Sequence, residues 1–235
     1  PTSGTVEING LTVKPENYEI IKKQIGYLPQ EFGLYPNLTV REALEYVGIM
    51  SGMEKAEYQK QIDYYLEATG LSAHQKKKNR QLSGGMKRRV GLIQALLHNP
   101  SVLIVDEPTT GLDPEERIRF RGIISALSQQ KIVLLSTHIV SDIEAIANQV
   151  ILLKKGSILD VKQPSELLHG LDGKVWSVTV DAEDEAELIQ KFSCSNIMHM
   201  DGKSVVRLIS EHQPYPEAIQ QSPNMEDMYL YYFGQ

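Results

Sequence analysis

Three short apolar runs, separated by stretches with helical spacing, constrain the fold of this chain more than any other feature. The runs are residues 102–105, 131–135 and 150–153. A strand in which nearly every side chain is apolar is typical of a parallel sheet that is covered on both faces. Asp113 and Pro114 are placed to start one intervening helix, and Ser141 is placed to cap the next. This alternation predicts a doubly wound α/β fold.

The stretch before these runs carries clear local signals. Residues 5–13 alternate apolar and polar side chains around Asn9-Gly10, which predicts a hairpin with a two-residue turn. Residues 25–28 predict a short strand. Thr39 and Glu42 have the spacing of a capping box, which predicts that a helix begins there.

The C-terminal part has a different pattern from the rest. It predicts a strand of alternating side chains near Trp176, a helix over about 183–192, a strand pair turning at Asp201-Gly202 and a terminal helix over 225–233. We therefore expect one domain over residues 1–170, with a helical subdomain over about 31–98, and a small α+β appendage over 171–235.

Composition narrows the class of protein. The 235 residues include 24 Lys and Arg against 30 Asp and Glu, and this net charge of −6 gives no electrostatic drive toward nucleic acid. The basic run at 76–80 is interpreted as a solvated loop. Cys194 is the single cysteine, which excludes an intramolecular disulfide and fits a reducing compartment. No apolar run is long enough to span a bilayer.

Two acidic residues, Asp106 and Glu107, follow the apolar run at 102–105. In doubly wound folds, ligands bind beyond the carboxyl ends of the strands. Asp106 can hold Mg²⁺ through its hydration shell, and Glu107 can polarise an attacking water. An apolar strand ending in two acids is also common in ordinary loops, so that interpretation stays open.

Ser83-Gly84-Gly85 precedes a predicted helix over about 86–97. Glycines there can leave backbone amides pointing at an anion such as phosphate, but the serine can equally be a simple helix cap. His138 follows a predicted strand and can donate a hydrogen bond to a phosphate oxygen or be purely structural. Gln30 offers an amide that can bind a cation or water.

In their order and spacing these features resemble the ABC-transporter ATPase family, over residues 1 to about 165. The resemblance is carried by Gln30 as the Q-loop glutamine, 82–85 as the signature motif, 102–107 as the Walker B strand with its general-base glutamate, 111–113 as the D-loop, and His138 as the switch histidine. It implies a P-loop NTPase-type sheet with a helical signature subdomain. It further implies an ATPase that uses ATP and Mg²⁺.

The resemblance also implies roles for single residues and for partners. Glu107 and His138 would be catalytic; Asp106 and Gln30 would hold the metal; the nucleotide would be bound by Gln30, Ser83, Gly84, Gly85 and Asp113. Partners would be a membrane permease and a second ATPase subunit, either the same chain or a paralogue, on the cytoplasmic face of the cell membrane. The tail at 226–229 resembles those of exporter ATPases. Phe32, Leu34 and Tyr35 are candidates for permease docking or for packing within the insert.

The sequence departs from the family pattern in two ways. Met86 stands where the signature usually has glutamine, which we expect to tune rather than abolish binding. No Gly-x-x-x-x-Gly-Lys-Ser/Thr pattern occurs in the 235 residues, and residues 170–174 have the wrong spacing for it. In the family that loop holds the β- and γ-phosphates. We expect that the chain lacks the family's first strand, P-loop and first helix, that it binds ATP poorly, and that it is inactive by itself although the intact protein is an ATPase.

Two other functions share some of these features. The head domain of a DNA-repair or chromosome-maintenance ATPase has the same motifs, but its long heptad coiled coils have no counterpart in the short insert. A non-enzymatic binding module would explain the missing loop, yet it would not require Glu107 and His138.

Overall fold

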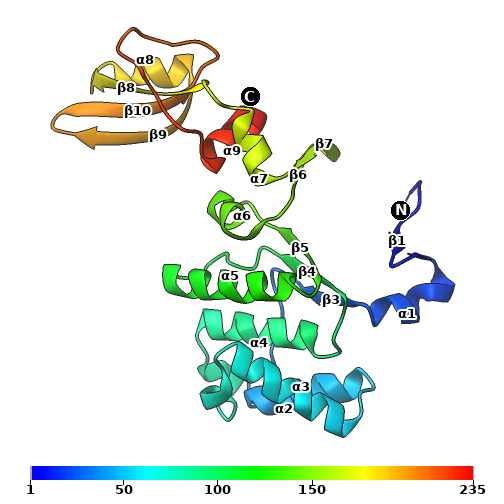
Figure 1. The fold of residues 1–235 in the computed structure, drawn as a ribbon. Helices are drawn as coiled ribbons and strands as arrows, with labels where there is room; N and C mark the ends of the chain where they lie inside the picture. The colour runs from blue at the N-terminus through cyan, green and yellow to red at the C-terminus, as the bar shows by residue number, and fades with distance from the viewer. Residues whose placement is uncertain (1, 235) are drawn as a thin grey trace. The chain divides into compact units, whose positions relative to one another are not determined.

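The computed structural model describes residues 2–234, which form two compact units, one that extends to His138 and one that begins at Ile139 (Figure 1). Each unit is described by itself. The contacts within the structure thus divide the chain after His138. The sequence instead predicts that the ATPase domain ends near residue 170, and that domain boundary stays a prediction.

The first unit is built on a parallel sheet with the order β3-β4-β5 among the described residues. The strands are β3 (Ile25–Leu28), β4 (Val102–Asp106) and β5 (Ile132–Ser136). Ile25 lies opposite Val102, which lies opposite Ile132. The predicted α/β class and the predicted strands at 25–28 and 102–105 are confirmed.

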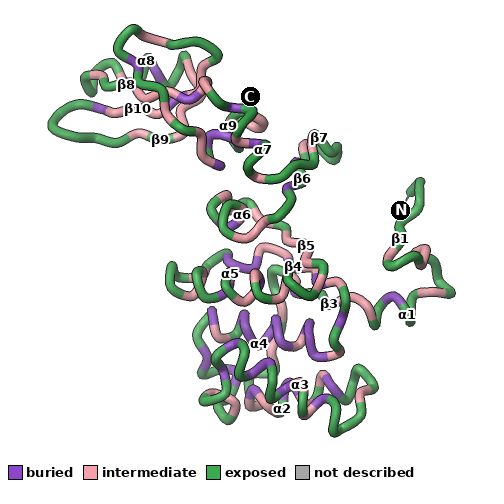
Figure 2. The backbone as a smooth tube through the Cα atoms, viewed as in Figure 1, coloured by how far each residue is buried: buried purple, intermediate pink, exposed green. Residues whose placement is uncertain are grey.

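One face of this sheet is buried under helices. Gly26 allows the closest approach, because a Cβ atom there would lie 2.2 Å from the carbonyl oxygen of Ala95. Leu28, Leu103 and Val105 complete the buried face. The covering helices are α4 (Gly84–Leu96) and α5 (Pro114–Ser128), and α4 is mostly buried (Figure 2).

The other face of the sheet is open. Tyr27, Ile132 and Leu134 are 55%, 63% and 51% exposed. The prediction that the strand at 131–135 is buried on both faces is therefore wrong for the described residues. The reason is that its side chains alternate between the helix-covered face and the open one.

The helical part of the first unit follows its local signals. Its helices are α2 (Val40–Met50) and α3 (Lys55–Ala68), packed beside α4. The predicted capping box is present: the Glu42 amide donates to Thr39 Oγ1 over 3.2 Å, and the Thr39 amide donates to Glu42 Oε2 over 2.8 Å. The Thr39 amide and the Thr39 hydroxyl both donate to the Glu42 carboxylate, and these two hydrogen bonds lower the pKa of that carboxyl.

The predicted hairpin is also present at the start of the chain. It consists of β1 (Glu7–Ile8) and β2 (Leu11–Thr12), followed by α1 (Tyr18–Lys22). Asn9 and Gly10 have φ of 49° and 78°, as a type I′ turn requires at both central positions. The Asn9 side-chain amide donates to Gln24 and Ser101, which ties the turn to the approach to β3 and β4.

The second unit begins with a helix and a hairpin. These are α6 (Val140–Ile146), β6 (Val150–Lys154) and β7 (Ser157–Lys162), followed by α7 (Pro164–His169). Two expectations are corrected here. Residues 150–153 pair antiparallel with β7 instead of joining the parallel sheet, and α6 begins after Ile139 with no side-chain cap, so Ser141 lies inside the helix.

The rest of the second unit is the predicted α+β appendage. Its sheet has the order β11-β8-β10-β9 and is accompanied by α8 (Glu185–Lys191) and the terminal helix α9 (Met225–Phe233). The strands are β8 (Val175–Asp181), β9 (Ser193–Met200), β10 (Lys203–Ile209) and β11 (Ile219–Gln220).

A buried carboxylate holds α9 against this sheet. Asp227 is fully buried, and its oxygens accept hydrogen bonds from the Arg207 guanidinium at 2.7 to 3.2 Å and from Ser195 Oγ at 2.6 Å. The amide of Asn224 donates to the same carboxylate over 2.8 Å, which completes a capping box at the start of α9.

Throughout residues 2–234, none of the helices combines the length and the apolar character that crossing a bilayer requires.

Candidate functional site

The loop of residues 106–110, called the Glu107 loop below, leaves the carboxyl end of β4. Glu107 has a φ of 44°, a left-handed conformation that few residues other than glycine adopt. Its amide donates to the Ser136 carbonyl over 3.0 Å, which ties the loop to the end of the neighbouring strand. A backbone held in a sparsely populated conformation is a feature of functional sites.

The Glu107 carboxylate is held from both sides. Its Oε1 lies 2.7 Å from His138 Nδ1 and accepts the His138 backbone amide over 3.0 Å, while its Oε2 accepts Thr110 Oγ1 over 3.1 Å. The structure therefore brings together Glu107 and His138, which are 31 residues apart. Sequence reasoning missed Thr110, although its position three residues after Glu107 in a tight turn was a usable signal.

Asp106 lies at the last position of β4, directly across from Ser136 on β5. Ser136 Oγ donates a hydrogen bond to Asp106 Oδ1. Sequence reasoning also missed this serine, whose contact depends on the pairing of two strands.

The oxygen donors at this edge suit Mg²⁺ held mainly by water and phosphate. Among residues 2–234, no cluster of three His, Cys, Asp or Glu side chains forms an all-protein metal cage. Mg²⁺ usually keeps several waters and takes one or two carboxylates together with substrate phosphates. Asp106 supplies such a carboxylate, so the residues present fit that ion.

Arg88, on α4, connects this edge to the Gln30 loop, which comprises residues 29–32. Its guanidinium donates to five backbone carbonyls, those of Pro29, Gln30, Asp106, Glu107 and Pro108, over distances of 2.6 to 3.0 Å. The residue is 6% exposed. Burial lowers the pKa of the Arg88 guanidinium, and the nearby carboxylates of Asp106 and Glu107 oppose that shift. No sequence expectation included this residue.

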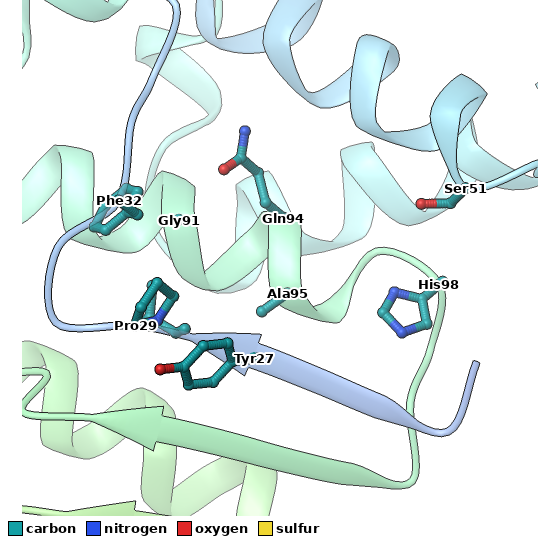
Figure 3. Close-up of a pocket in the computed structure, with 9 residues that line it drawn as sticks. Tyr27, Pro29, Phe32, Ser51, Gly91, Gln94, Ala95 and His98 are labelled. Atoms are coloured by element: carbon teal, nitrogen blue, oxygen red, sulfur yellow. The ribbon is translucent and has the colours of Figure 1, made fainter. Parts of the chain in front are cut away.

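Gln30 itself is exposed, and its backbone carbonyl is one of the five groups that Arg88 binds. Beside this loop lies a pocket of about 270 Å³ between β3 and α4 (Figure 3). Phe32 lies over Gly91 of α4, where a Cβ atom would be 2.5 Å from the ring, and the Arg88 guanidinium lies 5.5 Å from the ring centroid. Phe32 is thus partly a packing residue, while Tyr35 is 56% exposed.

The Ser83-Gly84-Gly85 segment forms the N-terminus of α4. Ser83 is the cap, since its Oγ accepts the Met86 amide over 3.2 Å. This contact uses an acceptor lone pair, so the hydroxyl proton stays able to donate to an anion. Ser83 and Gly84 are exposed, and a Cβ atom on Gly84 would meet nothing within 4 Å. The capping interpretation is confirmed, and phosphate binding stays a prediction.

Asp113 caps α5, as expected, with its Oδ1 accepting the Glu116 amide over 2.9 Å. Glu116 then links this helix to α4. Its carboxylate pairs with Arg89 over 3.1 Å and lies against Gly85, where a Cβ atom would be 2.4 Å away. A nucleotide role for Asp113 stays a prediction.

The predicted site residues thus fall into two groups. The first group contains Asp106 and Glu107, which are adjacent in the sequence, and His138, which contacts Glu107. Gln30 is connected to this group because Arg88 binds the backbone of all three loop residues, Gln30, Asp106 and Glu107. The other joins Ser83, Gly84, Gly85 and Asp113 through the capping contacts and Glu116. A carboxylate held beside an imidazole can accept a proton from water, and an exposed helix N-terminus favours an anion.

Comparison with known proteins agrees with this geometry. Residues 1–110 match the family model described as ABC transporter. The chain is 35% identical to the uncharacterized ABC transporter ATP-binding protein YxlF of Bacillus subtilis, over 88% of this chain and 68% of that one. It is 34% identical to the bacitracin transport ATP-binding protein BcrA of Bacillus licheniformis, over 89% and 68%.

A third relative, the Nod factor export ATP-binding protein I of Paraburkholderia xenovorans, is 35% identical over 72% of this chain and 55% of its own length. A solved structure of the ATP-binding subunit of an ABC transporter aligns with a TM-score of 0.62 and 27% identity, over 72% of this chain and 71% of that one. These matches do not favour the DNA-repair alternative. The chain belongs to the family of ABC transporter ATP-binding proteins, and it has the fold of their ATPase domain.

Proposed function

We propose that this chain belongs to the ATP-binding and ATP-hydrolysing subunit that powers a membrane ABC exporter, and that the 235 residues by themselves bind ATP poorly and are inactive. Members of its family are ATPases that bind ATP with Mg²⁺ and work with membrane permeases. The observation that carries the proposal is the Glu107 carboxylate, which is held between His138 and Thr110 at the carboxyl end of β4. A carboxylate fixed at this edge of a parallel sheet is placed to act on a bound ligand.

Glu107 would accept a proton from the attacking water as the water approaches the terminal phosphate. His138 would hold the carboxylate through Nδ1 and stabilise charge on that phosphate. Asp106 and Gln30 would hold Mg²⁺, whose charge would offset that of the phosphate oxygens when the ion is bound. Thr110 holds the second carboxylate oxygen, so that Glu107 keeps one orientation.

The second group of residues would act on the nucleotide of a partner subunit. Ser83 and Gly84 present a hydroxyl donor and a helix N-terminus to solvent, with the buried Gly85 next in the same turn, and this suits a phosphate brought by another molecule. Asp113 lies on the helix that contacts the same segment through Glu116. Two copies, or one copy and a paralogue, would then trap ATP between them and separate after hydrolysis.

We propose that the permease docks beside the Gln30 loop. The pocket there is lined by Tyr27, Phe32 and Gln94 among others, and it lies next to the loop that Arg88 holds (Figure 3). The bacitracin and Nod factor relatives are named for transport and export, which supports an exporter. The subunit would be cytoplasmic and peripheral on the inner face of the cell membrane.

Direct calorimetry should show that the 235-residue chain binds Mg-ATP weakly, with a Kd of about 1 mM or higher. The reason is that none of its 235 residues forms a Gly-x-x-x-x-Gly-Lys-Ser/Thr cradle for the β- and γ-phosphates. Mg-ADP is the control, because it lacks the terminal phosphate. Micromolar binding would show that other residues hold the phosphates.

His138→Ala should lower ATP turnover in the assembled transporter by about 10- to 100-fold, since the Glu107 carboxylate loses its 2.7 Å contact. Phosphate release in membranes is the measurement. His169→Ala is the matched control, because this exposed histidine contacts the Ser165 carbonyl of its own helix and its loss should leave turnover unchanged. Equal turnover by both variants would remove His138 from the mechanism, and a transporter without ATP turnover would contradict the proposed function.

A further inference from the structure

We infer that Arg88 is a positioning residue that fixes the Gln30 loop relative to the Glu107 loop, an inference that rests on the proposed ATPase function. An arginine side chain has five N–H donors and no acceptor. All five are used here: Nη1 donates to Pro29 and Gln30, Nη2 to Asp106 and Glu107, and Nε to Pro108. One planar group thus holds two loops about 80 residues apart in the sequence.

The form of this contact points to positioning rather than to charge pairing. A buried guanidinium is costly unless its donors are satisfied, and Arg88 is 6% exposed. The groups that satisfy it are backbone carbonyls, at 2.6 to 3.0 Å, on both loops. Lysine keeps the charge but has three donors on a flexible stem, so it cannot reproduce the fork.

Glu107 is the residue whose orientation depends most on this contact. Its left-handed φ of 44° is unfavourable and needs support from its surroundings. The peptide group before it is held by Ser136, which accepts its N–H, and its own carbonyl is held by Arg88. With both flanking groups fixed, the side chain is directed toward His138 and Thr110. Loss of the fork would let this backbone relax and the carboxylate turn away.

The same contact links the positions of the two loops. Because Gln30 and Glu107 share one guanidinium, a displacement of either loop breaks hydrogen bonds to the other. A permease that moves the Gln30 loop would thereby move the hydrolytic carboxylate. Arg88 would therefore couple permease docking to ATP hydrolysis.

Hydrogen–deuterium exchange on the 235-residue chain tests the structural part. In Arg88→Lys, amides of the Gln30 loop and of the Glu107 loop should both exchange at least about tenfold faster than in wild type. Arg89→Lys is the matched control, because Arg89 is also buried on α4 but binds the Thr69 carbonyl and Glu116. In Arg89→Lys, faster exchange should be confined to the amides near Thr69 and Glu116. Faster exchange in one loop only, or the same pattern in both variants, would overturn the inference.

A measurement on wild type covers the case in which Arg88→Lys does not fold. In NMR-detected exchange of the wild-type guanidinium at increasing urea, the Arg88 Nη1 protons, which donate to Pro29 and Gln30, should show the same denaturant dependence as the Nη2 protons, which donate to Asp106 and Glu107, because the loops open together. Different dependences, or slow exchange at only one of the two nitrogens, would overturn the inference.

Turnover in the assembled transporter tests the catalytic part. Arg88→Lys should lower kcat by about tenfold or more while KM for ATP stays within about threefold, since positioning acts on the transition state. An unchanged kcat, or a loss seen only in KM, would contradict positioning. If wild type hydrolyses no ATP, the proposed function fails, and the exchange experiments still decide whether Arg88 joins the loops.

Discussion

Glu107→Gln should lower ATP turnover in the assembled transporter by about 1,000-fold while leaving ATP-dependent association of the ATP-binding subunits intact. Glutamine has nearly the same shape: its carbonyl oxygen can accept the His138 amide in place of Oε1, and its NH2 group, in place of Oε2, can donate to the Thr110 hydroxyl, which is able to accept as well as donate. It cannot accept a proton from water, which removes general-base catalysis. Phosphate release measures turnover, and sedimentation with ATP or ADP measures association.

The control for this substitution is Glu187→Gln, which makes the same chemical change on an exposed helix of the second unit. It should leave both turnover and association unchanged. Rapid hydrolysis by Glu107→Gln would remove Glu107 from the mechanism. Loss of association would instead show that Glu107 contributes to the ATP-dependent association of the two subunits.

Asp227→Ala should destabilise the second unit by about 3–5 kcal/mol, the usual effect of removing one partner from a buried ion pair. Asp227 is fully buried and binds Arg207, Ser195 and the Asn224 amide. Its loss leaves the Arg207 guanidinium without its carboxylate and removes the cap of α9. Trp176 is the single tryptophan and lies in the second unit, so its fluorescence during urea unfolding reports on that unit.

Glu226→Ala is the matched control, because this neighbouring acid is exposed and should change the free energy of unfolding by less than about 0.5 kcal/mol. Asp227→Asn should fall between the two, since the amide keeps the shape and some hydrogen bonds. Equal midpoints for Asp227→Ala and wild type would show that α9 is held by its apolar contacts alone.

Features that depend on neighbours in the sequence were predictable. The hairpin at Asn9-Gly10, the capping box at Thr39 and the cap at Asp113 all follow from interactions between residues that are close in the sequence. The end of β4 at Asp106 followed equally well from the polarity change after an apolar run.

Features that depend on distant segments were not predictable from one sequence. Arg88 sits in a run of basic residues that is typical of a solvated helix face, and its five acceptors are backbone carbonyls, which every residue type possesses. The contact of Ser136 with Asp106 depends on the pairing of β5 with β4. The open face at Ile132 and Leu134 likewise depends on which elements pack there, not on the apolar run itself.

The attachment of both loops through carbonyl groups has a consequence for sequence variation. Any residue can supply a carbonyl, and proline at positions 29 and 108 supplies one without adding a donor. Side chains of the Gln30 loop other than Gln30 and Phe32 can therefore diverge, or be redesigned for a different permease, without loosening the attachment. The loop's partner specificity and its mechanical connection to the hydrolytic carboxylate can evolve separately.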